Sequence, residues 1–260
     1  MIPYYVVDAF ADAPFSGNPA GVCLPEAPLA DELMQKIAAE NNLPETAFVV
    51  KNGAVWDLRW FTPETEIDLC GHATLGTAFV LDRCTGAPGP YVFRTKSGEL
   101  RVVRKGELLE MDFPSRPPVS VPVVPAMSEA LGTRVLEAHQ SRDLVLVLDS
   151  ADGVRRLVPD MEKLKALPDA FGVIVTAKGE GDADFVSRFF APGAGIPEDP
   201  VTGSAHSTLI PFWAERLNKK IMKARQLSPR GGTLLCEHVG NRVKIAGSAR
   251  LYLQGKIFVE

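Results

Sequence analysis

Residues 59–81, RWFTPETEIDLCGHATLGTAFVL, are matched later in the chain by residues 188–210, RFFAPGAGIPEDPVTGSAHSTLI. Four identical residues recur at a constant offset of 129, namely Arg59/Arg188, Phe61/Phe190, Pro63/Pro192 and Ile67/Ile196. Further on, CGHA at 70–73 aligns with TGSA at 202–205 at an offset of 132, so the second copy contains three additional residues. The two stretches therefore resemble copies of one ancestral segment.

A third match follows in the same order, GEL at 98–100 with GTL at 232–234, and the three together predict an internal duplication. In the first copy, residues 72–81 (HATLGTAFVL) are apolar on nearly every face. A helix of this kind must be surrounded by protein rather than packed on one side. We therefore expect each half to be a sheet curled around a central helix, the second of which spans 204–217. Pro211 within it should either kink the helix or cost about 3 kcal/mol.

The remaining elements are expected to be short, because 21 prolines and 22 glycines punctuate the chain. Helical periodicity is present at 29–41. β-Branched and aromatic residues between turn signals predict strands at 4–10, 47–50, 55–61, 91–95, 99–104, 108–113, 142–148, 171–177, 184–190, 223–227, 233–238, 242–246 and 251–258. This order predicts an α+β protein with a barrel-like, mostly antiparallel sheet in each half. Four prolines within 115–125 disfavour regular structure, so we place the boundary there, between an N-terminal lobe of residues 1–116 and a C-terminal lobe of residues 117–260.

The composition is that of an ordinary globular chain. It has 260 residues, of which 46% are hydrophobic and 23% charged, and a formal net charge of −4. The chain has no block of five like charges and no basic stripe, which argues against a nucleic-acid or anionic membrane surface. The N-terminal residues lack a signal-peptide pattern, and no apolar run approaches the roughly 18 residues of a membrane span. The four cysteines are too few and too irregular for a disulfide framework, so we expect a soluble, cytoplasmic protein.

Two glycines mark the expected starts of the central helices, Gly71 and Gly203. A helix N-terminus has unpaired backbone N–H groups and the positive end of the helix dipole, and a glycine there lets a ligand approach the backbone closely. If both starts lie near one another, they can hold an anionic substrate jointly, above all a carboxylate. The alternative is that both glycines only allow sharp turns.

Three ionisable residues lie beside these starts. His72 follows the first glycine, Asp199 precedes the second by four residues, and Glu45 lies where a helix gives way to a strand. Pro200 keeps Asp199 out of helical geometry, so its carboxylate can point toward a substrate. The ordinary role of such an aspartate is a cap or turn, and that of a glutamate after proline is a solvated surface position. The residues alone leave both interpretations open.

Five motifs are distributed over the whole chain: DAFADAPFSGNPAGV (8–22), NNLPETAF (41–48), DLCGHATLGTAFVL (68–81), EDPVTGSA (198–205) and GSARLYLQGKI (247–257). Together they resemble the PhzF-like family, named for the phenazine-biosynthesis isomerase. The resemblance implies the two-lobed diaminopimelate epimerase-like fold, in which each lobe is a barrel-like sheet around a helix. It also implies a homodimer that needs neither cofactor nor metal, since the phenazine member moves a proton in a dihydro-hydroxyanthranilate without either.

The resemblance also implies roles for individual residues. Glu45 in NLPETAF matches the family's acid/base glutamate, and Gly71 with His72 matches its substrate-contacting pair. Asp199 and Ser204 in EDPVTGSA match its second-lobe aspartate and serine. Taken together with the helix starts, these matches predict the following set: catalysis by Glu45, Asp199 and His72, and substrate binding by Gly71, His72, Gly203 and Ser204.

The expected reaction moves a proton between two carbons of a small carboxylic acid. One group has to remove the proton and then return it, and such a group works best with a pKa near neutrality. Proton transfer of this kind contributes roughly 10²–10⁴-fold in rate, so positioning and anion binding have to supply the rest. The sequence does not identify the substrate beyond this class.

Two other functions are compatible with the sequence. Diaminopimelate epimerase and proline racemase are relatives that use two thiols, and Cys70 occupies the first-lobe position. Its second-lobe counterpart is Thr202, whose hydroxyl is a poor base, so a racemase is the weaker hypothesis. The chain could instead be a binding or regulatory module whose site is unused. The spacings of Cys70 with His72 and of Cys236 with His238 match no zinc motif, so no metal is expected.

Overall fold

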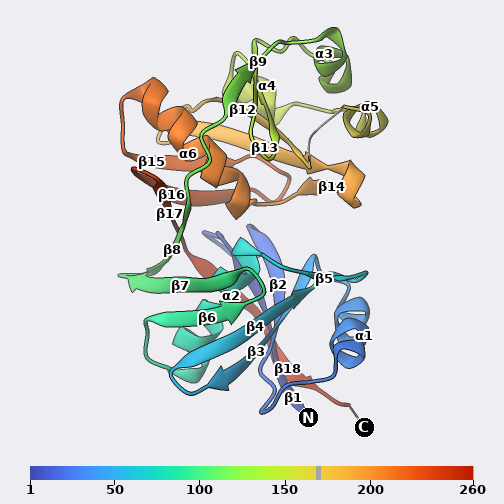
Figure 1. The fold of residues 1–260 in the computed structure, drawn as a ribbon, viewed down its shortest axis with the longest axis vertical. Coiled ribbons are helices and arrows are strands. Elements are labelled where there is room, and N and C mark those ends of the chain that lie inside the picture. The colour runs from blue at the N-terminus through green and yellow to red at the C-terminus, as the bar shows by residue number, and fades with distance from the viewer. Residues whose placement is uncertain (168–170, 260) are drawn as a thin grey trace. The chain divides into compact units, whose positions relative to one another are not determined.

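The chain forms two units, each with its own central helix. The computed structural model describes residues 1–167 and 171–259 (Figure 1). Unit 1 comprises Met1–Asp112 together with Ala246–Glu260, and unit 2 comprises Phe113–Ile245.

The expected lobes of residues 1–116 and 117–260 differ from these units in two places. Residues 113–116 belong to unit 2, so the boundary lies just before the proline-rich segment rather than within it. The C-terminal strand β18 (Ala249–Ile257) belongs to unit 1, because it pairs antiparallel with β1 (Ile2–Ala9) along its length. Local sequence patterns do not reveal a pairing between the two ends of a chain.

Unit 1 is a mostly antiparallel sheet that curls around a helix. After β1, its strands are β2 (Asn18–Cys23), β3 (Glu45–Asn52), β4 (Val55–Phe61), β5 (Glu66–Ile67), β6 (Tyr91–Thr95), β7 (Gly98–Lys105) and β8 (Leu108–Pro114). Helix α1 (Asp31–Asn41) connects β2 to β3 and buries Met34 and Ile37 against Phe48 and Phe61. This amphipathic helix confirms the periodicity seen in the sequence.

Unit 2 repeats this plan and adds short helices. Its strands are β9 (Val119–Val121), β10 (Glu137–Gln140), β11 (Leu144–Val147), β12 (Val173–Lys178), β13 (Phe185–Ala191), β14 (Ile196–Asp199), β15 (Ile221–Gln226), β16 (Gly232–Val239) and β17 (Arg242–Gly247). Helices α3 (Pro125–Leu131), α4 (Ala151–Arg155) and α5 (Met161–Lys165) pack against residues of β12 and β13. The sequence did not predict these helices, because five to seven residues do not establish a helical period.

The order of strand pairings is the same in both units, which confirms the duplication. In unit 1, β1–β2 is antiparallel, β2–β3 parallel, β3–β4 antiparallel, β4–β6 parallel and β6–β7 antiparallel. In unit 2 the same alternation is followed by β10–β11, β11–β12, β12–β13, β13–β15 and β15–β16. In each unit a short strand, β5 or β14, pairs back on the preceding strand before the central helix begins.

An arginine–glutamate pair stabilises the hairpin before each central helix. Arg59 Nε and Nη2 donate to the two oxygens of Glu66, both at 2.7 Å. Arg188 donates through the same two atoms to Glu198, at 2.7 and 2.8 Å. The arginines are 129 residues apart, but the glutamates are 132 apart. The three additional residues of the second copy therefore lie between Arg188 and Glu198.

The strand register places these additional residues within the hairpin. Ile67 pairs with Trp60 in unit 1, and Asp199 pairs with Phe189 in unit 2. Since Trp60 and Phe189 are 129 residues apart, Asp199 is the structural counterpart of Ile67. The sequence match of Ile67 with Ile196 is therefore wrong as a structural equivalence, because the turn between β13 and β14 is the longer one.

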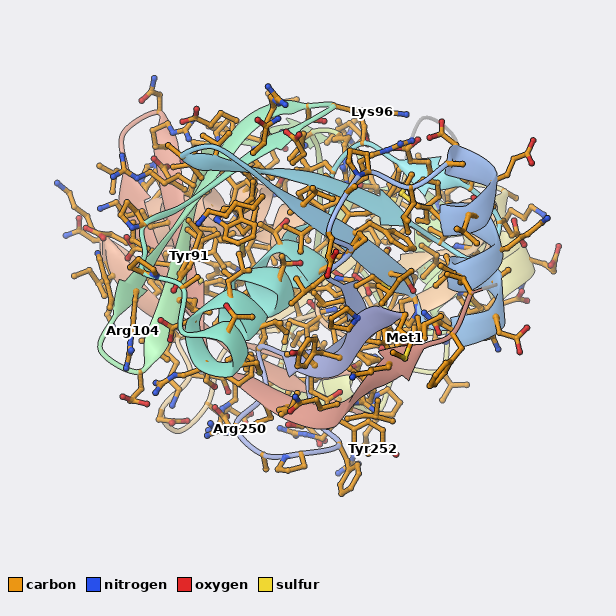
Figure 2. The ribbon with its side chains drawn as sticks, turned by 90° about the horizontal axis from the view of Figure 1, so that it is seen from below. Met1, Tyr91, Lys96, Arg104, Arg250 and Tyr252 are labelled. Atoms are coloured by element: carbon orange, nitrogen blue, oxygen red, sulfur yellow. The ribbon has the colours of Figure 1, made fainter. Side chains whose placement is uncertain are left out.

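The first central helix, α2 (Gly71–Phe79), is buried on every face. All residues from His72 to Ala78 are buried, as the apolar pattern predicts. Figure 2 shows this helix crossing the middle of unit 1 between the surrounding strands. It continues as a π-helical turn, Val80–Thr85, and ends at Gly86, where a φ of +70° favours a residue without a Cβ atom.

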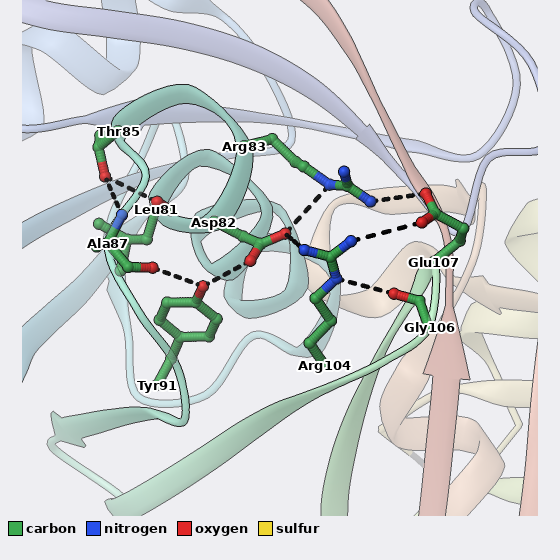
Figure 3. Close-up of polar contacts among 9 residues, drawn as sticks. All are labelled: Leu81, Asp82, Arg83, Thr85, Ala87, Tyr91, Arg104, Gly106 and Glu107. Carbon is green, nitrogen blue, oxygen red and sulfur yellow. Dashed lines mark hydrogen bonds and ion pairs between the residues drawn. The ribbon is translucent and has the colours of Figure 1, made fainter.

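A network of polar contacts fixes the C-terminal end of this helix (Figure 3). Asp82 accepts a hydrogen bond from the Tyr91 hydroxyl at 2.9 Å and forms ion pairs with Arg83 Nε at 3.1 Å and Arg104 Nη1 at 3.5 Å. Tyr91 lies on β6 and Arg104 on β7. The network ties the helix to the sheet at the end opposite Gly71, which sets the position of the helix start within unit 1.

The second central helix, α6 (Gly203–Leu217), continues through Pro211. Proline has no N–H to donate to the carbonyl of Ser207, four residues earlier. That carbonyl instead accepts a hydrogen bond from the backbone N–H of Arg116 at 2.9 Å. The proline-rich segment thus replaces the missing hydrogen bond, which lowers the cost expected of Pro211.

Every strand and helix predicted from the sequence overlaps an observed one. The strands that the prediction omitted are β2, β5, β9, β10 and β14. Four of these, β5, β9, β10 and β14, have four residues or fewer, which is too short for a sequence period to be recognised. Among residues 1–167 and 171–259, no helix is long and apolar enough to cross a membrane.

Candidate functional site

In unit 1, Glu45 and His72 form a buried pair. Glu45 is the first residue of β3 and is 8% exposed, and His72 lies in the first turn of α2 and is 5% exposed. His72 Nε2 lies 2.9 Å from Glu45 Oε2. The two side chains are therefore within ion-pair distance of one another in the interior of the unit.

The parallel pairing of β2 and β3 brings Glu45 to this position. Helix α1 is followed by its C-cap residue Asn42, where a φ of +46° reverses the chain. Strand β3 then begins with Glu45 opposite Ala20 of β2. Helix α2 packs on the same two strands, so its first turn and the first residue of β3 meet inside the unit. A solvated surface position for Glu45 is thereby excluded.

Asn18, at the start of β2, contacts the other side of the His72 ring. Its side-chain nitrogen lies 3.1 Å from His72 Nδ1, and the residue is fully buried. Gly17 precedes it with a φ of +70°, and a Cβ atom there would lie 2.2 Å from the carbonyl oxygen of Ala9. Only glycine therefore fits at this turn. A carboxamide can present either a donor or an acceptor, so Asn18 can contact both protonation states of the ring.

The electrostatic surroundings of His72 favour its charged form. Burial acts against the charge, but the neighbouring Glu45 carboxylate and the hydrogen bonds to the ring oppose this and hold the pKa of His72 above its ordinary value of 6.5. The Glu45 carboxylate, 2.9 Å from Nε2, is thus a neighbour that favours a positive charge on the ring inside the unit. A buried donor beside a buried acceptor is an arrangement suited to proton transfer.

Cys70 is the N-cap residue of α2, and its sulfur lies 3.5 Å from His72 Nδ1. Burial, together with the charge of Glu45, raises the pKa of this thiol, so Cys70 stays protonated. The ligating atoms of Glu45, Cys70 and His72 lie within 4.8 Å of one another, a spacing that a metal ion could bridge. A cation would have to displace protons from both Cys70 and His72 at the positive end of a helix dipole. The three residues thus fit proton transfer better than metal binding.

In unit 2, Asp199 ends β14 and lies just before the start of α6. Its extended backbone agrees with the restriction that Pro200 imposes. The hydroxyl of Thr202, the N-cap residue of α6, donates to Asp199 Oδ2 at 2.5 Å. This side chain therefore does not cap the helix, and the side chain of Cys70 does not cap α2 either. The first backbone N–H groups of both helices are not bonded to their N-cap side chains.

Ser204 lies in the first turn of α6, next to a positive charge. Arg142 Nη2 lies 3.3 Å from the Ser204 hydroxyl and 3.3 Å from Asp143 Oδ2. Burial raises the pKa of Asp143, although Arg142 acts against this. The guanidinium of Arg142 also lies over the ring of Phe171, at 4.8 Å from its centroid. A cation is thus held beside the helix start that we expect an anion to approach.

The structure places the residues named from the sequence in two groups. The members in unit 1 are Glu45, Gly71 and His72, and those in unit 2 are Asp199, Gly203 and Ser204. Their roles in binding and catalysis stay predictions. The sequence analysis missed Asn18, although it belongs to the quoted motif at 8–22. It also missed Arg142 and Gln226, because neither belongs to a motif and only the folded sheet brings them to α6.

A hollow of about 430 Å³ lies elsewhere on unit 1, lined by residues of α1, β3, β4 and β6. Its cationic residues Arg59, Arg94 and Lys96 pair with carboxylates of Glu66 and Asp57. Neither residue of the buried acid–base pair lines it. Its charges are already engaged by the fold, so we do not place the chemistry there.

The chain matches one known family over nearly its whole length. The family model for phenazine biosynthesis-like protein, PhzC-PhzF, matches residues 7–255. An uncharacterized isomerase of Pseudomonas aeruginosa is 52% identical over 259 residues, which cover 99% of this chain and 98% of that protein. The crystal structure of a PhzF family protein from Enterococcus faecalis has a TM-score of 0.98 and 51% identity, with 99% of each chain covered.

A more distant neighbour is similar in fold alone. The crystal structure of a hydroxyproline epimerase from Agrobacterium vitis has a TM-score of 0.64 at 11% identity, covering 98% of this chain and 91% of that one. The expected epimerase-like fold is thereby confirmed, and the name of the Pseudomonas relative confirms the expected isomerase class. The motifs, the duplicated sheets and these matches together show that the chain belongs to the phenazine biosynthesis-like, PhzC-PhzF family.

Proposed function

We propose that this isomerase moves a proton between two carbons of a small carboxylic acid, with Glu45 as the group that removes and returns the proton. The observation that carries the proposal is the burial of Glu45 beside His72, whose ring Nε2 lies 2.9 Å from Glu45 Oε2. A buried carboxylate beside a titratable ring is suited to take up a proton and to return it.

The reaction balances without a co-reactant. Glu45 takes a proton from one carbon, and the electron pair of the broken C–H bond moves into the adjoining π-system of the substrate. A second carbon of that system then takes the proton from the Glu45 carboxyl group, so that substrate and product are isomers. The imidazolium of His72 offsets the negative charge that develops on the substrate. This sequence of steps needs no metal or organic cofactor.

Anion binding explains why the substrate is expected to be a carboxylic acid. Gly71 and Gly203 begin the two central helices, whose first N–H groups are not bonded to their N-cap side chains. We place the substrate carboxylate against the N–H groups of such a helix start. Asp199 is then the second carboxylate of the site, and Ser204 is a hydrogen-bonding partner of the substrate.

The experiment is a measurement of deuterium uptake from heavy water by a panel of small cyclic and amino carboxylic acids, including a dihydro-hydroxyanthranilate and proline. The wild-type protein is expected to place deuterium on carbon in at least one acid. Glu45→Gln should lower this rate by about 10²–10⁴-fold, since a carboxamide cannot accept the proton. Its melting temperature should fall by only a few degrees, because the two side chains have similar volumes and His72, unlike an arginine, can release its proton when the carboxylate is lost.

Glu66→Gln is the matched control. It makes the same chemical change at another poorly exposed glutamate of unit 1, whose partner is Arg59. It should lower the melting temperature without lowering turnover. Full activity of Glu45→Gln, or no uptake by any acid of the panel, contradicts the proposal. Binding of an acid without uptake favours the binding module, and inversion at the α-carbon of proline favours a racemase.

The family resemblance leads us to propose, in addition, a cytoplasmic homodimer. Light scattering of the purified protein in solution should give twice the chain mass of 28.1 kDa. A mass of 28.1 kDa at micromolar concentration would contradict the dimer without affecting the proposed chemistry.

A further inference from the structure

Every polar atom of Thr202 has a partner within unit 2. Its backbone N–H donates to Gln226 Oε1 at 2.9 Å, and its carbonyl accepts from His206 Nδ1 at 2.8 Å. Its hydroxyl oxygen lies 3.1 Å from Gln226 Nε2 and 2.5 Å from Asp199 Oδ2. The residue that joins the loop to α6 is therefore held in place at four points.

The chemistry of these groups fixes the direction of each hydrogen bond. A backbone N–H can only donate, so the carbonyl end of the Gln226 side chain faces Thr202 N–H, and its NH₂ group faces the Thr202 hydroxyl. The hydroxyl therefore accepts from Gln226, and its single proton is directed at the carboxylate of Asp199. The Gln226 NH₂ group also donates to the backbone carbonyl of Asp199 at 2.8 Å. The side chain of Gln226 is thus hydrogen-bonded both to Thr202 and to Asp199.

Packing alone does not account for a glutamine at this position. Gln226 is the last residue of β15 and is 1% exposed. Met222 and Ala224 are the other buried residues of that strand, and both are apolar. A buried carboxamide costs free energy unless its polar atoms are all bonded, and an apolar side chain would avoid that cost. The amide is therefore best explained by what it holds in place.

We propose that Gln226 is a positioning residue for the reaction: through Thr202, it fixes the orientation of the Asp199 carboxylate at the start of α6. This inference rests on the proposed function, because it assumes that Asp199 acts on the substrate. Thr202 then has a defined task, which is to direct its hydroxyl proton at Asp199, and it is not a counterpart of a catalytic thiol.

The test compares variants that differ in single hydrogen bonds. Gln226→Met keeps the volume but removes the amide, Thr202→Val removes the hydroxyl, and Thr202→Ser retains it. Thr176→Val is the matched control in the same unit. Thr176 is another fully buried hydroxyl, which accepts from Trp213 Nε1 at 3.0 Å and donates to a strand carbonyl at 2.7 Å.

The readout is kcat and KM for deuterium uptake by the panel acid on which the wild-type protein acts. Gln226→Met and Thr202→Val should each lower kcat by about 10- to 100-fold while KM changes little, because a misplaced carboxylate affects the reacting geometry more than substrate binding. Thr202→Ser should stay within about 3-fold of wild type, since the hydroxyl is rescued. The double variant Gln226→Met/Thr202→Val should be no slower than the slower of the two single variants, because both changes disrupt the same Asp199–Thr202 contact. Thr176→Val should lower the melting temperature and leave kcat unchanged.

The outcomes separate this inference from the proposed function. Full kcat in Gln226→Met, with loss of activity in Asp199→Asn, overturns the positioning role alone. Full kcat in Asp199→Asn overturns the use of Asp199 in the proposed function. A crystal structure of Gln226→Met is a test that needs no substrate. The distance between Asp199 Oδ2 and Thr202 Oγ1 should exceed about 3.5 Å, and an unchanged contact overturns the inference.

Discussion

The starts of the two central helices have the same backbone plan but different side-chain chemistry. In α2, the carbonyl of Cys70 accepts from the hydroxyl of Thr74, and in α6 the carbonyl of Thr202 accepts from the ring of His206, four residues later in each case. Around this shared plan, unit 1 holds the buried pair of His72 and Glu45. In unit 2, the amide of Gln226 donates to the hydroxyl of Thr202, which donates to the carboxylate of Asp199. The duplication therefore repeats the scaffold and not the reaction chemistry.

The two carboxylates proposed to act on the substrate, Glu45 and Asp199, come from different places in the repeat. Asp199 lies at the end of the hairpin in unit 2, and its counterpart in unit 1 is the apolar Ile67. Unit 1 instead presents Glu45 from β3. This difference between the units agrees with the proposed reaction, in which Glu45 alone moves the proton.

Loss of the second carboxylate is expected to have the largest effect. Asp199→Asn should lower the rate of deuterium uptake by about 10²–10⁴-fold, with little change in melting temperature, because the residue is partly exposed and the amide has nearly the same volume. The rate is measured by NMR and the melting temperature by calorimetry. Wild-type turnover in this variant would mean that only unit 1 takes part in the chemistry.

The two hairpin ion pairs should differ in their contribution to stability. Arg188 is 9% exposed and its other bonds go to backbone carbonyls, whereas Arg59 is 30% exposed and has Asp31 as a second anionic partner. Glu198→Gln should therefore lower the free energy of unfolding by about 3 kcal/mol, since it leaves a buried cation without its anion. Glu66→Gln should cost only about 1 kcal/mol. Urea denaturation measures both values, and equal losses would refute this difference in burial.

The histidines at the two helix starts should respond to pH in opposite directions. Burial lowers the pKa of His206 to about 4, and its Nε2 has no hydrogen-bond partner among the described residues to accept from an added proton. The unfolded chain therefore takes up this proton first, and the native state loses about 3 kcal/mol as the pH falls from about 6.5 to 4. The comparison with His206→Gln isolates this loss, because glutamine does not titrate. A constant difference in stability between pH 7 and 4 would contradict a neutral buried ring.

His72 gives the opposite sign. Its native pKa is raised, so the stability that its charge contributes is complete below the ordinary value of 6.5. This contribution is lost as the pH rises through the raised native value. The stability of wild type relative to His72→Gln should therefore decrease on the alkaline side, as measured by urea denaturation between pH 6 and 10. A wild-type advantage that instead grows with pH would show that the His72 ring is neutral.

The smallest effect is expected at Cys70. Because its thiol stays protonated, Cys70→Ala should retain turnover within about 3-fold, and a chelator should change neither turnover nor melting temperature. Uptake assays with and without EDTA measure both effects. A loss of activity in Cys70→Ala would revive the two-thiol hypothesis, and a loss on chelation would assign a metal to the three buried ligands.

The fold could be predicted from the sequence because its main features can be recognised within short stretches of residues. The match of residues 59–81 with 188–210 indicated the duplication, and the apolar faces of 72–81 indicated an enclosed helix. The return of β18 to unit 1 could not be predicted, since it depends on pairing between distant strands. The three additional residues were misplaced for a similar reason, because only the register of Asp199 with Phe189 locates them.

The candidate site residues were predicted in part. They were identified from the motifs shared with the family and not from hydrophobic periodicity or residue spacing. Glu45 follows a proline and looks like a surface residue, and its burial depends on the pairing of β2 with β3. Asn18 of β2 contacts His72 at the start of α2. Gln226 of β15 accepts a hydrogen bond from Thr202 at the start of α6. Such supporting residues have no sequence signature, because their partners are near in space and distant along the chain.

The most direct test of the account is a crystal structure of Glu45→Gln with the acid that the wild-type protein turns over. The carbon that loses its proton should lie within about 3.5 Å of the side chain at position 45, with the substrate carboxylate against the N–H groups of a central helix start. An acid bound away from position 45, for example in the hollow lined by α1 and β4, would contradict the account.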